Sequence, residues 1–118
     1  MPSVVDLIGE SVINQKGENV STTTFCEEGR VVGLYFAALF DESSVAFTPL
    51  LADVYERIRE TDRGKGFEIV YLSSDRDEDN FNEFRKEMPW HAVPFANVDT
   101  VVSSSTWQII RVIIIRSD

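Results

Sequence analysis

The chain has 118 residues, 43% of them hydrophobic, and a formal net charge of −9. This composition predicts one globular domain with its own core and excludes a disordered chain. The negative charge argues against nucleic acids and anionic membranes as partners, because both are bound through basic patches. A single cysteine excludes an internal disulfide and a cysteine zinc site. We therefore expect no metal and no cofactor.

The sequence shows no targeting segment. Residues 1–6 have no basic stretch followed by an apolar one, and no apolar run approaches the roughly 20 residues of a membrane span. The single cysteine fits a reducing compartment. We therefore predict a cytoplasmic protein that does not enter membranes, with secretion by an unconventional route left open.

The first predicted element is a β-hairpin. Residues 8–14 and 19–25 have weak strand patterns. Residues 15–18 between them form a predicted turn, in which Gly17 supplies a positive φ angle.

A strand–helix–strand unit is predicted to follow. Residues 30–38 are a continuous apolar run without alternation, which is typical of a central strand buried on both faces. Residues 43–60 switch to a helical period, with Ser43 or Ser44 as the N-cap and Pro49 as a kink. The apolar positions of this helix are Val45, Phe47, Leu50, Leu51, Val54, Tyr55 and Ile58. Residues 67–73 then form a second buried strand, parallel to the first.

The last third of the chain is less regular. Residues 75–79 begin like a calcium loop, but Asn80 and Lys86 stand where such a loop needs glycine and glutamate, so we predict a helix-capping turn. A second helix is expected over residues 78–88. Residues 98–106 make a poor helix, whereas residues 109–116 are a strong strand pattern.

Four motifs, in this order, resemble the tryparedoxin and nucleoredoxin branch of the thioredoxin superfamily. They are Tyr-Phe-Ala-Ala at 35–38, Phe-Thr-Pro-Leu-Leu at 47–51, FEIVYLSSD at 67–75 and MPWHAVPF at 88–95. The resemblance covers about residues 4–97 and implies a single thioredoxin-like α/β domain over residues 1–118. That fold has an N-terminal hairpin and a βαβ core. The divergent residues 98–118 imply a truncated or altered C-terminus.

The resemblance also identifies a turn in which the family's chemistry is missing. Counting back from Phe47 places the family's Cys-x-x-Cys on residues 41–44 and its preceding tryptophan on Phe40. These four residues are Asp41, Glu42, Ser43 and Ser44. No proline follows Pro94, so the family's cis-proline has no counterpart either. We predict a redox-inactive protein with no catalytic residue.

The residues at the turn have simpler roles in this interpretation. Asp41 is a helix-start acid, and Ser43 and Ser44 are caps, because a nucleophilic serine needs an adjacent base and an oxyanion hole. His91 is the one histidine and cannot make a metal site alone. Cys26 precedes two glutamates, which raise the pKa of a thiol. An intermolecular disulfide through Cys26 stays open.

The predicted function is a protein-binding or trophic-signalling module with an unidentified protein partner. Phe40, Trp90 and Phe95 are the candidate binding surface, although core packing is the favoured interpretation for the last two. Residues 5–10 and Tyr-Phe-Ala-Ala are most similar to nucleoredoxin-like relatives of rod-derived cone viability factor. This similarity implies a role in photoreceptor or sensory-neuron maintenance.

Three alternatives accompany this prediction. One is a thiol-dependent oxidoreductase or peroxidase-type activity through Cys26. Another is a chaperone-like holdase. The third concerns assembly: the strand of residues 109–115, from Ile109 to Ile115, is an apolar edge that favours a homodimer, and Arg111 and Arg116 blunt it.

Overall fold

The computed structural model describes residues 8–25, 30–62, 64–75, 77–95 and 111–116. In the last of these segments only the side chains of Val112 and Ile114 are described. Cys26 and the predicted irregular stretch 98–106 lie outside the described residues. Among the described helices, none has the length and apolar character needed to cross a membrane.

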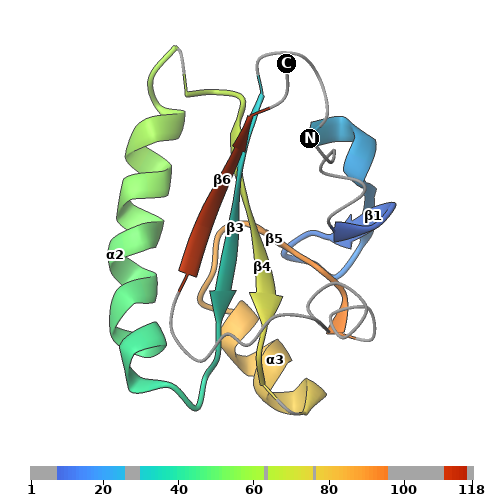
Figure 1. Cartoon of the computed structure of the whole chain (residues 1–118), viewed down its shortest axis with the longest axis vertical. Helices are drawn as coiled ribbons and strands as arrows, with labels where there is room; N and C mark the ends of the chain where they lie inside the picture. The colour runs from blue at the N-terminus through green and yellow to red at the C-terminus, as the bar shows by residue number, and fades with distance from the viewer. Residues whose placement is uncertain (1–7, 26–29, 63, 76, 96–110, 117–118) are drawn as a thin grey trace.

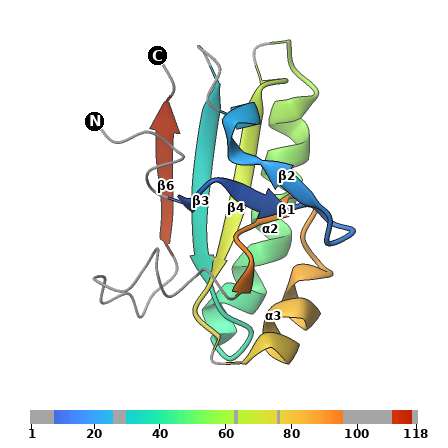
Figure 2. The same cartoon turned by 90° about the vertical axis from the view of Figure 1, so that its right-hand side faces the viewer.

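The fold is a mixed sheet with both described α-helices on one face (Figures 1 and 2). Its strand order is β2-β1-β5-β4-β3-β6. The strands are β1 Ser11–Ile13, β2 Asn19–Ser21, β3 Val31–Ala37, β4 Phe67–Ser73, β5 His91–Ala92 and β6 Arg111–Arg116. β3 and β4 are parallel, as predicted, and β6 pairs antiparallel with β3. The thioredoxin-like α/β arrangement expected from the sequence is therefore confirmed.

The N-terminal hairpin is present but shorter than predicted. β1 and β2 have three residues each, and Gly17 between them has a φ of +83°. The second strand was predicted to run to Phe25, but Thr22–Phe25 forms the 3₁₀ helix η1. η1 forms because Phe25 turns into the core, where it is buried beside Ile8 and Val12.

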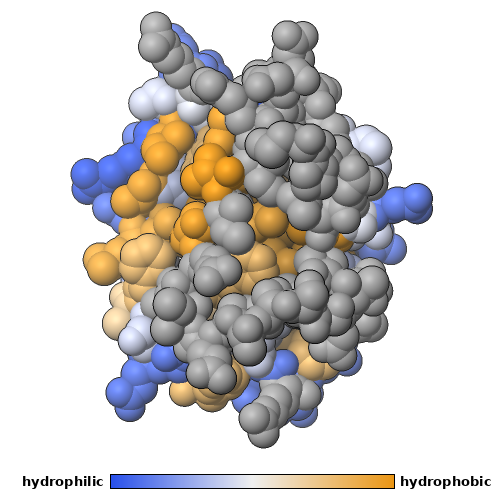
Figure 3. Space-filling model, viewed as in Figure 1, coloured by the Kyte–Doolittle hydropathy of each residue, from blue (hydrophilic) through white to orange (hydrophobic). Residues whose placement is uncertain are grey.

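Helix α2, Glu42–Arg59, connects β3 to β4. Only some of the apolar positions predicted for this helix face the core. Phe47, Leu51 and Tyr55 pack on the sheet, but Leu50 is 65% exposed. Other exposed apolar side chains on the helix are Val45, Val54 and Ile58. The helix runs on through Pro49. Apolar residues gather over α2 and beside β6 on the face seen in Figure 3.

Helix α3, Glu78–Arg85, is three residues shorter at its C-terminal end than predicted. Its N-cap is Asp77, whose carboxylate accepts the Asn80 amide at 2.7 Å. The acidic stretch is therefore a capping turn, as predicted. Phe81 and Phe84 point inward and are buried.

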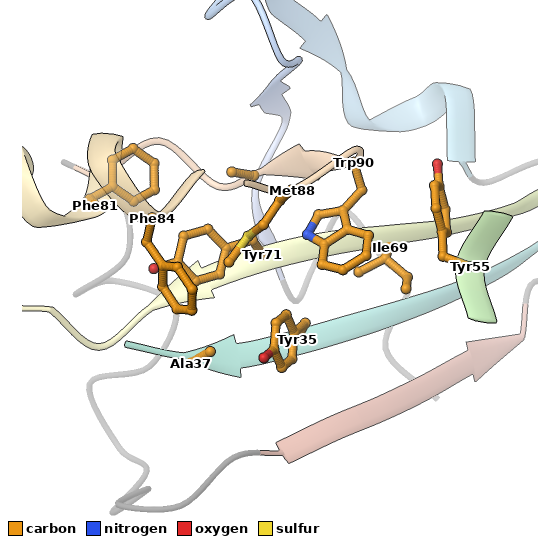
Figure 4. Packing of buried hydrophobic residues seen from close by; sticks show 10 residues of the cluster. Tyr35, Ala37, Tyr55, Ile69, Tyr71, Phe81, Phe84, Met88 and Trp90 are labelled. Carbon is orange, nitrogen blue, oxygen red and sulfur yellow. The ribbon is translucent and has the colours of Figure 1, made fainter. Parts of the chain in front are cut away.

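The core on the helix side of the sheet is aromatic (Figure 4). Trp90 lies edge-on to two tyrosines, with ring centroids 5.8 Å from Tyr35 and 5.4 Å from Tyr55. Tyr71 stacks on Phe81 at 5.7 Å. Edge-on and stacked aromatic pairs add to the stability gained by burial alone. This layer holds β3, β4 and both helices together beneath the candidate site.

Candidate functional site

The turn between β3 and α2 lies at the carboxyl end of the parallel strands, where sites in open α/β sheets form. The side chain of Asp41 caps α2, since Asp41 Oδ2 accepts the Ser44 amide at 3.2 Å and the Ser44 hydroxyl at 2.8 Å. The predicted N-cap, Ser43 or Ser44, was therefore wrong. The helix begins earlier because the carboxylate of Asp41 reaches two donors at once. The expectation of a helix-start acid at Asp41 is confirmed.

Ser44 is fixed inside the turn. Its hydroxyl donates to Asp41 and accepts the Ala38 amide at 3.2 Å. Its carbonyl accepts the Thr48 hydroxyl, which lies 2.8 Å from the hydroxyl of Tyr35. Burial raises the pKa of Tyr35, so that this phenol stays protonated. Ser44 is buried with both roles of its hydroxyl used, and a serine held this way is not available to a substrate.

A second carboxylate, that of Asp75, holds the backbone at the start of the turn, and this role was not predicted from the sequence. Asp75 follows β4, and its two oxygens each lie 3.0 Å from the Leu39 amide. The same group accepts the Ser73 hydroxyl at 3.2 Å. A signal was present, because an acid just after a parallel strand lies at the same sheet edge as the turn after its neighbour. Asp75 is therefore a structural residue of the turn.

The candidate surface residues are not brought together. Phe40 stands next to the turn and is 66% exposed, the most exposed large apolar side chain described. Trp90 is 1% exposed in the aromatic core, and Phe95 is half-buried against Phe81. The structure thus removes Trp90 from the predicted surface, because Tyr35 and Tyr55 enclose its ring. Phe40 remains with the exposed Glu42 and Ser43.

His91 lies away from the turn. Its ring is half-buried beside Glu68, near the start of β4, whereas the turn lies beyond the end of that strand. No imidazole base therefore faces Ser43 or Ser44. The site therefore consists of a capped helix start with an exposed aromatic side chain beside it, and it presents a surface for binding.

Replacing Asp41 with alanine is expected to destabilise the protein by about 0.5–2 kcal/mol, because the first turn of α2 loses its cap. Asp41→Asn should recover most of this loss, since asparagine accepts the same hydrogen bond. Urea unfolding of both variants measures the difference. Ser43→Ala is the matched control and should change little, because Ser43 is exposed. An equal loss of stability in Ser43→Ala would show that the effect of Asp41→Ala does not come from the lost helix cap.

Comparison with known proteins defines the class. The sequence matches the thioredoxin-like family profile over residues 29–118, which includes the C-terminal segment. Tryparedoxin I from Crithidia fasciculata superposes with a TM-score of 0.77 at 30% identity, over 92% of this chain and 74% of that one. A thioredoxin from Wuchereria bancrofti gives 0.80 at 28% identity, over 99% and 81%. The chain belongs to the thioredoxin-like family.

Sequence relatives narrow the assignment to one branch. A probable nucleoredoxin 2 from rice is 39% identical over 88 residues, which are 75% of this chain and 21% of that protein. Human nucleoredoxin is 33% identical over 92 residues, 78% of this chain and 20% of that protein. The chain is thus a member of the nucleoredoxin and tryparedoxin branch, and it spans about a fifth of the length of the nucleoredoxins that it matches.

Proposed function

We propose that this chain is a thioredoxin-like protein-binding module that does not exchange thiols. The observation that carries the proposal is the start of α2, where the family's two thiol positions hold an N-capping carboxylate and a buried hydroxyl. A carboxylate cannot form a mixed disulfide, and thiol–disulfide exchange needs a thiolate as the attacking group. The turn keeps the architecture of a redox site with different side chains.

Binding at this turn is supported by Phe40. Exposed aromatic side chains are enriched among the residues that dominate protein–protein interfaces. Phe40 is the residue next to the capped helix start, and a hydrogen bond from the Asp41 amide to the Ala38 carbonyl at 3.2 Å closes the backbone around it. A rigid turn presents such a side chain with little loss of conformational entropy on binding.

Affinity capture with variants tests the proposal. A partner bound through the turn should be retained by the wild-type chain in excess dithiothreitol and lost by Phe40→Ala. Val45→Ala is the matched control, because Val45 is also an exposed apolar residue of this region but lies on α2. Retention that disappears with dithiothreitol would instead support a thiol-dependent interaction through Cys26.

The finer roles implied by the resemblance remain proposals. A cytoplasmic location and a part in photoreceptor or sensory-neuron maintenance rest on sequence similarity to nucleoredoxin-like proteins alone. Loss of photoreceptor or sensory-neuron survival on deletion of the gene would support the second of these. Normal survival would remove it.

A homodimer is a separate proposal, and the position of β6 supports it. Within the described residues β6 is the last strand of the sheet, and Ile114 on it is 58% exposed. Such an edge can pair with a second strand. Light scattering at micromolar concentration should then give twice 13.4 kDa, and Ile114→Lys should give one copy. A wild-type mass of one copy, with no growth over time, contradicts the dimer.

A holdase is favoured by a different observation, the exposed apolar side chains on α2. Such patches bind other apolar surfaces. If this activity exists, the chain should suppress aggregation of a heat-denatured client at near-equal concentration, and Leu50→Lys should weaken the effect. Unchanged client aggregation would remove this alternative.

A further inference from the structure

A buried carboxylate joins β4 to the end of α2. Glu68 is 4% exposed, and its Oε1 accepts the Tyr55 hydroxyl at 2.7 Å and the Ile69 amide at 3.2 Å. Its Oε2 pairs with Arg59 Nη1 at 2.9 Å. A buried charge without partners is costly, so these contacts keep Glu68 ionised inside the fold. The proposed function does not use this cluster.

His91 approaches the same carboxylate from β5. Its Nδ1 lies 3.6 Å from Glu68 Oε1, which is too far for a hydrogen bond. Nδ1 is buried and has no hydrogen-bond partner among the described residues. Phe25 of η1 lies edge-on to the imidazole, with ring centroids 5.2 Å apart. Only the protonated ring can form an ion pair with Glu68, and histidine changes charge between pH 5 and 8.

The place of His91 in the sheet gives this contact a structural consequence. β5 has only two residues, and it joins β4 to the N-terminal hairpin. His91 pairs with Val70 of β4, while Ala92 pairs with Ile13 of β1. The N-terminal hairpin therefore pairs with the rest of the sheet at Ala92, the residue next to His91.

We propose that His91 and Glu68 form a proton-operated latch, which holds β5 and the N-terminal hairpin on the sheet more tightly when His91 is protonated. The latch is closed when the imidazole carries a proton and loosens when the imidazole is neutral. The direction follows from charge, because protonation adds an attraction to a carboxylate that is already ionised.

Glu68 and Tyr55, the titratable partners in this cluster, keep their charge states between pH 5.5 and 7.5. Burial by itself raises the pKa of Glu68, but its interactions with His91, Tyr55 and Arg59 outweigh burial and leave the pKa below its ordinary value. Burial and the nearby carboxylate raise the pKa of Tyr55, which stays neutral. From the side of η1, the guanidinium of Arg30 lies over the Phe25 ring at 5.7 Å. Glu27 and Glu28 lie outside the described residues.

Amide hydrogen exchange between pH 5.5 and 7.5, corrected for intrinsic exchange rates, tests the latch. Protection factors in β1, β2 and β5 should fall by about three- to tenfold over this range, which corresponds to an ion pair of about 0.6–1.4 kcal/mol. Protection in β3 should stay constant. Because the chain has one histidine, His91→Gln should remove the pH response.

Two controls separate the latch from a general effect of pH. Lys86→Gln removes an exposed ion pair with Glu83 and should keep the wild-type response. His91→Phe keeps an aromatic ring beside Phe25 and should give a flat profile if charge is the cause. A wild-type hairpin whose protection does not change with pH, or a response that persists in His91→Gln, overturns the proposal.

Discussion

The double variant Asp41→Cys/Ser44→Cys, in a Cys26→Ser background, is expected to reduce insulin with dithiothreitol at least about tenfold faster than the same background alone. The side chains of residues 41 and 44 already touch, since Asp41 Oδ2 lies 2.8 Å from Ser44 Oγ. A thiol at the start of the 18-residue helix α2 gains from the helix dipole, which lowers its pKa. Insulin turbidity measures the rate.

The pair Glu42→Cys/Ser43→Cys is the matched control. Both positions are exposed, and neighbours in a helix do not face each other, so these thiols should not act as a pair. The rate of insulin reduction by this control should stay within about twofold of the rate of the Cys26→Ser background. Equal rates for the two pairs, with both proteins folded, would mean that residues 41–44 are not the counterpart of the redox turn.

The second large effect is expected at Trp90. Trp90→Ala should lower the free energy of unfolding by about 3–5 kcal/mol, because it leaves a cavity between Tyr35 and Tyr55. That loss is a large share of the stability of a domain of this size. The shift of the urea midpoint at constant slope measures it.

Phe40→Ala is the control for Trp90→Ala. Phe40 is exposed, so its removal should change stability by no more than about 0.5 kcal/mol. Trp90→Phe should fall between the two. A nearly neutral Trp90→Ala would contradict the core position of this side chain and return it to the predicted binding surface.

The sequence predicted the centre of the fold well because burial on both faces leaves a direct pattern. Continuous apolar runs identified β3 and β4, and their bounds fall within one residue of those observed. Gly17 was sufficient to place the hairpin turn, because a positive φ angle there favours glycine.

The sequence could not decide which apolar positions of α2 face the core. Phe47, Leu51 and Tyr55 are spaced by four residues, and so are Leu50, Val54 and Ile58. Both sets form a stripe along a helix, so periodicity alone predicts an apolar face wider than the face that contacts the sheet. The sheet beneath the helix contacts one set and leaves the other at the surface.

The position of the site was predicted by counting back from Phe47, but the contacts within the site were not predicted. Ser43 and Ser44 were the predicted caps and Asp41 only a helix-start acid, whereas the observed cap is Asp41, because the cap depends on where the chain leaves β3. The contact of Asp75 with Leu39 joins residues 36 positions apart, so the only signal for it is the place of Asp75 just after β4, at the same sheet edge as the turn. Trp90 follows a helix end in a motif of mixed polarity, so its burial depends on the tyrosines that enclose it.

Insulin reduction by the unmodified protein is the decisive test of the proposal that this thioredoxin-like chain does not exchange thiols. The wild-type chain and Cys26→Ser should both leave insulin precipitating at the rate of dithiothreitol alone. A wild-type rate well above that of dithiothreitol, lost in Cys26→Ser, would contradict the claim and make Cys26 a redox-active thiol.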